Sequence, residues 1–375
     1  MNTPLTPNER VTAAIHLEKP DRTPVAALIG YSVAKWAGVT IADYMFKPEV
    51  RVPLMRKAFE DLGGWDYHME PPPVFENRVG AFNFMPVKVQ RPGIELPADS
   101  SPQFEEREVM LASDYALVLE KGWARFVRED LVPRAFTAEE IAAAPANPPN
   151  MDAEGDKPYY RQRNLFIFEG AYNQIPFEYF SLARSCPAFV RDLYRQPDKV
   201  IAAADAMIPE LIAALQSMRK TADAPVSFGA NRCSSGFLSA KQFEKFALPY
   251  WQRLLEPFAP TASSIYLHLD QSWTRFLPYF KEFPKGHYIL HFDSMTDMAK
   301  AKEVLGENFC LMGDVPPSLL SLGTPDQVRS YCTKLIDSAG KGGGLILSPG
   351  CCAPDHATFE NVKAMIDVAQ TYPIN

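Results

Sequence analysis

The sequence lacks the motifs that define nucleotide-binding and nucleic-acid-binding classes. No GxGxxG turn follows an apolar run, and no GK[ST] follows the glycines at 342–344, so neither a dinucleotide fold nor a P-loop is expected. The chain has 38 basic and 45 acidic residues, a net charge of −7, without a sustained basic run. Because nucleic-acid affinity comes largely from clustered Lys and Arg, nucleic acid is not an expected partner.

Long apolar runs and cysteine motifs are also absent from the sequence. No window approaches twenty apolar residues, and the first ten residues, MNTPLTPNER, contain no hydrophobic signal core. We therefore expect a cytoplasmic protein without a membrane partner. The six cysteines show no CxxC spacing, and only Cys351 and Cys352 are adjacent. In a reduced compartment they are expected to be free thiols or isolated ligands rather than a disulfide framework.

The second half of the chain alternates apolar strands with helical segments. The expected strands lie at 164–170, 226–230, 265–270, 288–293, 308–315 and 343–350. Such fully apolar strands, each followed by a helical pattern, predict a parallel sheet of the α/β class. With further strands at 23–30 and 65–70 the count is about eight, which favours a (β/α)₈ TIM barrel. An open, doubly wound sheet is the alternative.

The first half is organised differently. Helices are expected at 7–19 and 47–63, but residues 74–160 are poorly periodic and rich in proline and charge, with pieces that could pair as hairpins. We interpret that stretch as a divergent N-terminal insertion or cap within a single domain of residues 1–375. A barrel with insertions can reach this length as one domain.

Polar side chains follow several of the expected strands. His268 and Asp270 end one strand, and His291 and Asp293 end the next. Residues i and i+2 of a strand point to the same face, so each pair presents an imidazole beside a carboxylate. Each pair could bind a metal, form a catalytic dyad, or be a buried hydrogen-bonded pair. Cys351, after another strand, is either a ligand or a small core residue.

Arg184, Arg232 and Asp293 each have both a functional and a structural interpretation. Arg184 and Arg232 lie near the starts of their segments and could clamp a substrate carboxylate, or form ordinary salt bridges. Asp293 is followed by the segment 294–297, which is typical of a helix N-cap. A capping or supporting role is therefore the alternative to catalysis for Asp293.

Several segments together resemble a known group of enzymes. These are ERVTAAIHLEKPDRTPV near the start, VAKWAGVTIADYM at 33–45, and AKEVLGENFCLMGDVPPSLLSLGTPDQV with GGLILSPGCCAPDHATFENVKAMID near the end. They resemble the uroporphyrinogen decarboxylase-like superfamily, and more closely its corrinoid:coenzyme M and O-demethylase methyltransferase branch. The resemblance is close to end to end, apart from about 74–160, and it implies a (β/α)₈ barrel.

For the methyltransferase branch, the resemblance implies a zinc ion held by His-x-Cys at one strand end and by the cysteine of a later P-G-C motif. His268 matches the family histidine and Cys351 the P-G-C cysteine, but Asp270 stands where the family usually has cysteine. True uroporphyrinogen decarboxylases carry an arginine-rich motif after the first strand. Residues 24–50 contain no arginine here, so uroporphyrinogen itself is not the expected substrate.

The leading hypothesis is a zinc-dependent methyl transfer enzyme that acts on a small molecule with a separate corrinoid protein. His268, Asp270 and Cys351 would hold the zinc, and Cys352 and His356 could supplement or replace Cys351. His291 and Asp293 would handle protons or support the ligands, while Arg232 and Arg184 would bind substrate. The alternatives are a metal-free decarboxylase or lyase for a small acid, which would use Arg184, Arg232 and Asp293, and a binding protein without chemistry.

Overall fold

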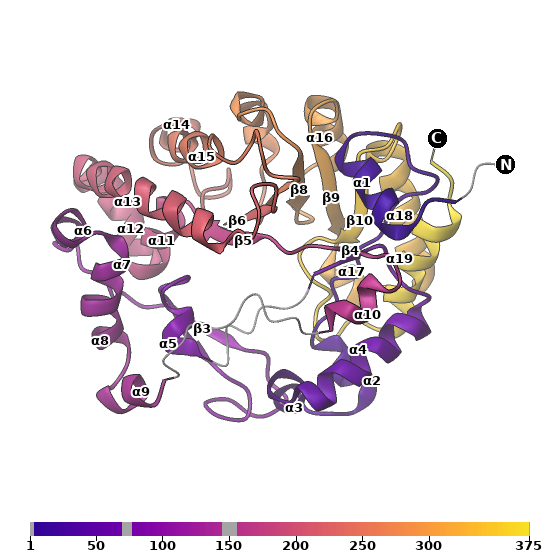
Figure 1. Cartoon of the computed structure of the whole chain (residues 1–375), viewed down its shortest axis with the longest axis horizontal. Helices are drawn as coiled ribbons and strands as arrows, with labels where there is room; N and C mark the ends of the chain where they lie inside the picture. The colour runs from indigo at the N-terminus through magenta and orange to yellow at the C-terminus, as the bar shows by residue number, and fades with distance from the viewer. Residues whose placement is uncertain (1–3, 70–76, 145–155, 375) are drawn as a thin grey trace.

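The computed structural model describes residues 4–69, 77–144 and 156–374. At its centre is a parallel sheet of six strands in the order β10-β9-β8-β7-β6-β5 (Figure 1). Its strands are β5 (Ala171–Gln174), β6 (Val226–Ala230), β7 (Ile265–Leu269), β8 (Tyr288–Phe292), β9 (Cys310–Val315) and β10 (Leu345–Pro349). Their bounds agree with the expected strands to within two residues from 226 onward, which confirms the parallel α/β arrangement.

Hydrogen bonds close this sheet into a ring. The amide of Ala26 donates to the carbonyl of Leu347 on β10, at 2.9 Å, and the carbonyl of Val25 accepts from the amide of Asp66, at 2.8 Å. Strand β1 (Tyr67–His68) then pairs with β4 (Phe166–Ile167), whose chain continues into β5. Residues 24–26 and β1 therefore complete an eight-membered ring, and the predicted (β/α)₈ barrel is confirmed.

The first expected strand is much shorter than its sequence suggested. Residues 23–30 were expected to form one strand, but the structure has only a bridge between Val25 and Leu347. Pro24 has no amide to donate, and Leu28 has a φ of 42°, which ends the extended backbone. The expected helix that stops at the glycines after 62 is confirmed as α4 (Pro48–Leu62), because Gly63 adopts a φ of 85° at its end.

The interior of the barrel has an apolar layer near the amino ends of the strands. Tyr266, Ile289 and Ile346 belong to it, and α1 (Pro7–Ile15) covers it from below with Val11. The alternate residues of the same strands face outward into a larger core under the helices. Above the apolar layer, toward the carboxyl ends, the inward positions are polar. In a barrel of this kind the carboxyl ends carry the functional site.

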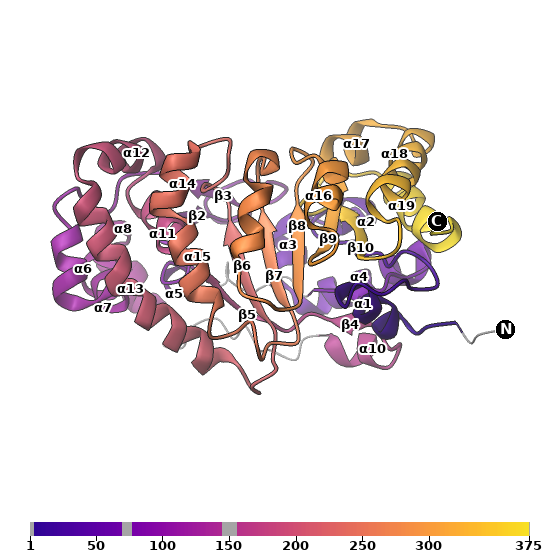
Figure 2. The same cartoon turned by 90° about the horizontal axis from the view of Figure 1, so that it is seen from above.

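Helices surround the strands, and α1 and α19 lie at the same end of the molecule (Figures 1 and 2). The helices before β5 are α2 (Ser32–Ala37), α3 (Ile41–Phe46), α5 (Arg78–Ala81), α6 (Tyr115–Lys121), α7 (Trp123–Phe126), the π-helical η1 (Val127–Leu131), α8 (Val132–Ala135), α9 (Ala138–Ala143) and α10 (Lys157–Arg161). The later ones are α11 (Pro176–Ala183), α12 (Cys186–Arg195), α13 (Pro197–Met218), α14 (Ala240–Phe246), α15 (Leu248–Leu255), the 3₁₀ helix η2 (Thr274–Glu282), α16 (Met298–Leu305), α17 (Pro317–Leu322), α18 (Pro325–Ala339) and α19 (Phe359–Thr371).

The stretch at 74–160 lies partly outside the described residues, which resume at 77–144 and again from 156. Its described part contains a two-stranded antiparallel hairpin of β2 (Lys88–Gln90) and β3 (Gln103–Glu105), as the hairpin expectation required. Helices α6 to α9 gather at the end of the molecule away from α19 (Figures 1 and 2). The amides of Val109 and Met110 donate to the carbonyl of Ala183, at 2.9 and 2.8 Å, and attach this stretch to α11.

One described helix, α13, is long and apolar enough to cross a membrane by length and composition alone. In this fold it packs against α6, α15 and β5. Its apolar residues, among them Val200, Met207 and Leu211, belong to the main core. Helical neighbours thus cover the apolar side of α13.

The carboxylate of Asp66 is fully buried at the ring closure, so its loss should destabilise the fold strongly. It pairs with Arg10 and Arg22, both at 2.7 Å, and accepts from the amide of Val25 at 3.0 Å. We expect Asp66→Ala to lower the free energy of unfolding by about 3–5 kcal/mol, since both cations and an amide lose their partner. Urea unfolding measures this loss.

The exposed pair of Lys57 and Asp61 supplies the control, because Asp61→Ala should cost no more than about 0.5 kcal/mol. Equal losses for the two variants would contradict a special role for Asp66.

Candidate metal centre

The two His-x-Asp pairs lie side by side at the mouth of the barrel. Strands β7 and β8 are parallel, and their register pairs His268 with His291. The apolar residues on either side of each histidine belong to the outer core, so both imidazoles face the barrel interior. Asp270 and Asp293 follow two residues later at the same edge. The histidine and aspartate of each pair therefore share the inward face, as the i, i+2 alternation predicts.

His268, Asp270 and Cys351 come together into one cluster. One potential ligand atom from each lies within 4.8 Å of the other two. Nε2 of His268 is 3.2 Å from Oδ1 of Asp270, and the two side chains are 22% and 29% exposed. Cys351 belongs to the turn after β10, three strands further round the ring, and it is half-buried. The cluster is thus shielded yet reachable from solvent.

The donor atoms of this cluster fit a zinc site. Protein zinc is held by N, O and S ligands at about 2.0–2.3 Å in a tetrahedral arrangement, which places two N or O ligands about 3.3 Å apart. The 3.2 Å between His268 and Asp270 agrees with that separation. The sulfur of Cys351 supplies the third ligand type that zinc accepts. Three protein ligands leave one coordination position for a substrate, as catalytic zinc sites do.

His291 fixes the orientation of His268. Nε2 of His291 lies 2.9 Å from the carbonyl oxygen of Pro349, which can only accept, so the hydrogen sits on Nε2. Nδ1 of His291 is then an acceptor, and Nδ1 of His268 lies 3.1 Å away and donates to it. Burial, aided by His268, lowers the pKa of His291 to about 3, so the ring stays neutral near pH 7. The lone pair of His268 is consequently left on Nε2, facing Asp270.

Tyr266 is a contributor to the site that the sequence reasoning missed. Its hydroxyl lies 2.5 Å from Nδ1 of His291, the same atom that His268 approaches. Burial raises the pKa of Tyr266 well above its usual value, so the hydroxyl keeps its proton and shares the single lone pair of that nitrogen with the N–H of His268. Tyr266 stands two positions before His268 on β7. The alternation that identified Asp270 as a neighbour of His268 could therefore have identified Tyr266 as well.

Asp293 lies close to the cluster, but its carboxylate already binds backbone amides. Oδ2 accepts from the amide of Gln271 at 2.6 Å, and Oδ1 accepts from that of Met295 at 2.8 Å. Burial raises the pKa of Asp293. The helix cap expected here belongs to Asp297, whose side chain accepts from the amide of Lys300 at the start of α16. Asp293 instead ties the loop after β7 to the loop after β8.

The two arginines expected to clamp a substrate carboxylate are engaged with carboxylates of the chain itself. Arg184 pairs with Asp192 at 2.6 Å and with Glu108, and it also donates to a backbone carbonyl. Arg232 pairs with Glu106 at 2.9 Å and donates to the carbonyl of Ser181. Within the described residues, neither guanidinium bonds to the cluster. The structure therefore brings together the three expected ligands but not the two arginines.

Cys352 and His356 follow Cys351, and neither belongs to the cluster of ligand atoms found among the described residues. Both are exposed. A hydrogen bond between the neighbouring thiols, together with burial, raises the pKa of Cys351. That bond lowers the pKa of Cys352 to about 7. Cys351 must therefore lose a tightly held proton before it can bind a metal.

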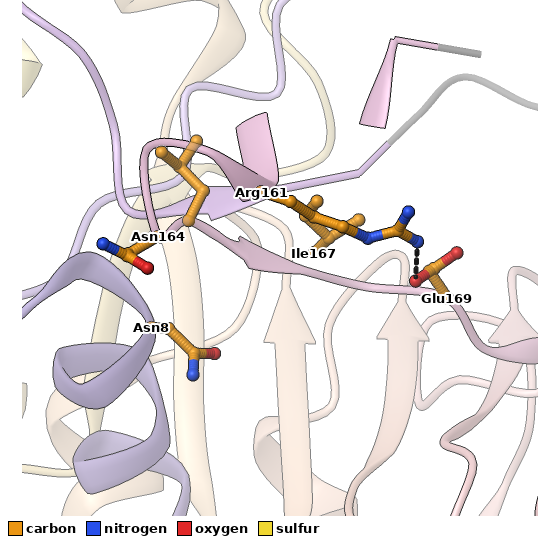
Figure 3. Close-up of a pocket in the computed structure, with 6 residues that line it drawn as sticks. Asn8, Arg161, Asn164, Ile167 and Glu169 are labelled. Carbon is orange, nitrogen blue, oxygen red and sulfur yellow. Dashed lines mark hydrogen bonds and ion pairs between the residues drawn. The ribbon is translucent and has the colours of Figure 1, made fainter. Parts of the chain in front are cut away.

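Two surface depressions of about 300 and 360 Å³ lie away from this cluster. The first, shown in Figure 3, is beside the amino end of β4, where Asn8 and Asn164 flank it. The ion pair of Arg161 with Glu169, at 2.8 Å, spans it (Figure 3). Functional sites of such barrels lie at the carboxyl ends of the strands, whereas the amino-end face serves stability. The cluster at the carboxyl ends remains the candidate site.

The chain is a closed parallel α/β barrel whose polar mouth carries a His/Asp/Cys cluster. A family model described as uroporphyrinogen decarboxylase (URO-D) matches residues 176–372, more than half of the chain. The chain therefore belongs to the uroporphyrinogen decarboxylase family, which agrees with the resemblance found in the sequence. The matched region begins at α11 and includes all of the strands that carry the cluster.

Curated relatives include both decarboxylases and a methyltransferase. The uroporphyrinogen decarboxylase of Gloeobacter violaceus is 29% identical over 143 residues, and that of Trichodesmium erythraeum 27% over 140. The Methylcobamide:CoM methyltransferase MtbA of Methanosarcina mazei is 26% identical over 196 residues, 52% of this chain. The matches span only 40%, 38% and 56% of those relatives, respectively. A solved methyltransferase from Methanosarcina mazei, at 18% identity, superposes with a TM-score of 0.66 and covers 98% of this chain and 99% of its own. That likeness shows the fold.

Asp314, at the carboxyl end of β9, makes stability depend on pH. Burial raises its pKa to about 6, and Tyr331 donates to it at 2.9 Å. The folded state thus holds this proton more tightly than the unfolded chain, so Asp314 costs stability as the pH rises from about 4 to about 6. We expect Asp314→Asn to be about 2–3 kcal/mol more stable than wild type at pH 7.5, with the difference vanishing below about pH 4.

Urea unfolding of both proteins from pH 4 to 8 tests this expectation. Asp326→Asn is the control, since Asp326 is 93% exposed on the same helix as Tyr331 and should show no such trend. A difference between wild type and Asp314→Asn that does not change with pH would rule out the proposed protonation.

Proposed function

We propose that this chain is a zinc-dependent methyltransferase that acts on a small thiol or ether together with a corrinoid protein. The observation that carries the proposal is the convergence of His268, Asp270 and Cys351 at the mouth of the barrel. Membership of the uroporphyrinogen decarboxylase family and similarity to MtbA support it. The cytoplasm is the compartment we propose for this reaction, because Cys351 must remain reduced to bind metal.

Each ligand has a defined contribution in this proposal. His268 presents Nε2, Asp270 an oxygen, and Cys351 its sulfur, with the fourth position open to the substrate. A bound zinc ion would supply Lewis acidity, which favours the ionised, nucleophilic form of a thiol or polarises an ether oxygen. Asp270 in place of a thiolate keeps the ligand charge but makes the site harder. The site should therefore bind zinc less exclusively than one with a second cysteine.

His291 acts as a positioning residue in this proposal. A neutral, fully buried imidazole with a pKa near 3 cannot exchange protons usefully at pH 7. Its hydrogen bonds instead hold the tautomer and orientation of His268, the usual task of groups behind a metal ligand. Asp293 has a similar supporting role, because both of its oxygens hold the loops around the mouth. In this proposal His291 and Asp293 position the site rather than exchange protons.

A protein partner is supported by the rim of the mouth. Phe237, Met295 and Leu322 are 46%, 61% and 88% exposed, and they lie in the segments that follow β6, β8 and β9. The segments after parallel strands all lie at the carboxyl-end face. Exposed apolar residues at such a rim suit a protein surface that docks over the site.

The metal-free lyase has less support. It relied on Arg184, Arg232 and Asp293, and all three are engaged within the chain, as described above. A lyase for a small acid would need at least one free cation near the substrate. A pure binding protein would not require three different metal-ligand types to meet at one point.

Metal analysis of the purified protein tests the proposal. We expect about one zinc per chain in the wild type. His268→Ala or Cys351→Ser should hold less than about 0.1 zinc per chain, because a catalytic site with three protein ligands loses most of its zinc affinity when one ligand is removed. His356→Ala is the matched control, an exposed histidine five residues after Cys351 that should leave the zinc content unchanged. Only a trace of zinc in wild type, or full zinc in His268→Ala, would overturn the proposed site.

The preference of the carboxylate of Asp270 for harder metal ions gives a second test. Asp270→Cys should raise the affinity for zinc relative to manganese by at least about tenfold, because a thiolate prefers the softer ion. Asp270→Asn should lower the affinity for both ions, since it removes the ligand charge. Competition with a chromophoric chelator measures both. An unchanged zinc-to-manganese ratio in Asp270→Cys would show that residue 270 is not a ligand.

A further inference from the structure

The inner face of β5 carries a second polar group that the proposed zinc site does not use. Asn173 points outward, since its side chain donates to the carbonyl of Leu211 on α13 and accepts from Tyr179. By the alternation of a strand, Tyr172 and Gln174 therefore point into the barrel. Nε2 of Gln174 lies 2.6 Å from the hydroxyl oxygen of Tyr172 and donates to it.

This pair faces the cluster across a glycine. The register of β5, β6 and β7 places Gln174, Gly229 and His268 at one level of the barrel. A Cβ at residue 229 would stand 2.6 Å from the hydroxyl of Tyr172. Only glycine at this position lets that hydroxyl lie over β6, on the side toward β7. The charge of Asp270 is among those that act on Tyr172, which agrees with this placement.

The pair has hydrogen-bonding capacity that the described chain leaves unused. Gln174 is 1% exposed, and its Oε1 is buried with no partner among the described residues. The hydroxyl of Tyr172 accepts from Gln174 but donates to no described residue, and burial raises its pKa to about 12, so it keeps that proton at pH 7. If the amide of Gln174 is turned over, the hydroxyl of Tyr172 donates to Oε1, and the NH₂ group and the hydroxyl oxygen of Tyr172 become the unused donor and acceptor. Buried polar atoms without partners are costly, and they commonly mark a binding site.

The described surroundings of the pair offer no lysine or arginine to an anionic ligand. Across the described residues, no lysine or arginine bonds to Tyr172, Gln174, His268 or Asp270, while Arg184 and Arg232 are paired with carboxylates. The charges that act on Tyr172 are those of the carboxyl groups of Glu178 and Asp270. Among the described residues, a carboxylate or sulfonate placed here would find no lysine or arginine to pair with.

We propose that Tyr172 and Gln174 bind an uncharged hydroxyl group of the substrate whose sulfur or ether oxygen occupies the His268, Asp270 and Cys351 site. The substrate hydroxyl accepts from Tyr172 and donates to Oε1 of Gln174, so both unused groups are satisfied at once. The inference rests on the proposed function for the position of the reacting atom. It adds the substrate class, a small neutral hydroxy-thiol or hydroxy-ether rather than an anionic thiol.

Thiol binding to the cobalt(II)-substituted protein tests the substrate class. The thiolate-to-cobalt absorption band is titrated with 2-mercaptoethanol, ethanethiol and 2-mercaptoethanesulfonate. Wild type should bind 2-mercaptoethanol at least about tenfold more tightly than the other two, the usual effect of satisfying buried polar groups. Tyr172→Phe and Gln174→Leu should lose that preference with unchanged metal content. Tyr179→Phe, which alters an outward-facing tyrosine nearby, should keep it.

A preference that survives in both β5 variants, or equal affinities of wild type for the three thiols, would overturn the inference while leaving the zinc site intact. Tighter binding of the sulfonate would also overturn it. Absence of a stoichiometric metal site would instead overturn the proposed function, and a second measurement then decides the role of the pair.

That second measurement is the thermal stability of the metal-free protein. If the pair is kept for binding, the double variant Tyr172→Phe/Gln174→Leu should unfold at the same temperature as wild type or about 1–3 °C higher, because the orphaned polar atoms are removed. If the pair is structural, the melting temperature should fall, as it should for Tyr179→Phe, whose hydroxyl has a buried partner. A fall in the double variant would overturn the inference whether or not metal is bound.

Discussion

The hydrogen bonds that join residues 24–26 to β10 are the constraint on which the site depends. Cys351 follows β10, whereas His268 is on β7, and in an open sheet these strands would diverge with β8 and β9 between them. Closure through Ala26 and Leu347 curves the sheet until the ends of β7 and β10 meet at one mouth. The buried Asp66 secures the same junction by neutralising two arginines and holding the amide of Val25. A structural carboxylate at one end of the barrel thus supports the cluster at the other.

Strand register is the second constraint, and it separates the roles of look-alike residues. His268 and His291 occupy equivalent positions on neighbouring strands, but their surroundings differ. His291 is enclosed by Tyr266 and the carbonyl of Pro349, so burial keeps it neutral and committed to hydrogen bonds. The side chain of His268 is 22% exposed and turns its Nε2 toward Asp270. Two similar sequence patterns therefore yield a ligand candidate and its support, because one imidazole is fully buried and the other is partly exposed.

Much of the fold could be predicted from the sequence because its strands are fully apolar and evenly spaced. The cluster was also accessible, since His268 and Asp270 share a face by alternation and Cys351 ends another strand of the same sheet. The functions of other residues depend on partners that no local pattern reveals. Arg184 and Arg232 are engaged by Glu108 and Glu106, which come from the poorly periodic stretch between β1 and β4. Gln174 became visible only when the register placed it beside Gly229 at the level of His268.

The departures from the family pattern belong together physically. Asp270 in place of a cysteine would harden the proposed metal site, and residues 24–50 contain no arginine that could bind an anionic porphyrinogen. The wall at Tyr172 and Gln174 is uncharged, and the arginines that could have faced the mouth are neutralised within the chain. Each feature removes positive potential or adds an oxygen ligand near the same point. Under the proposed function, a site altered in this direction would select against anionic substrates and toward a neutral, oxygen-bearing one. The barrel is retained, while the electrostatics of its mouth would set the proposed substrate apart from a porphyrinogen.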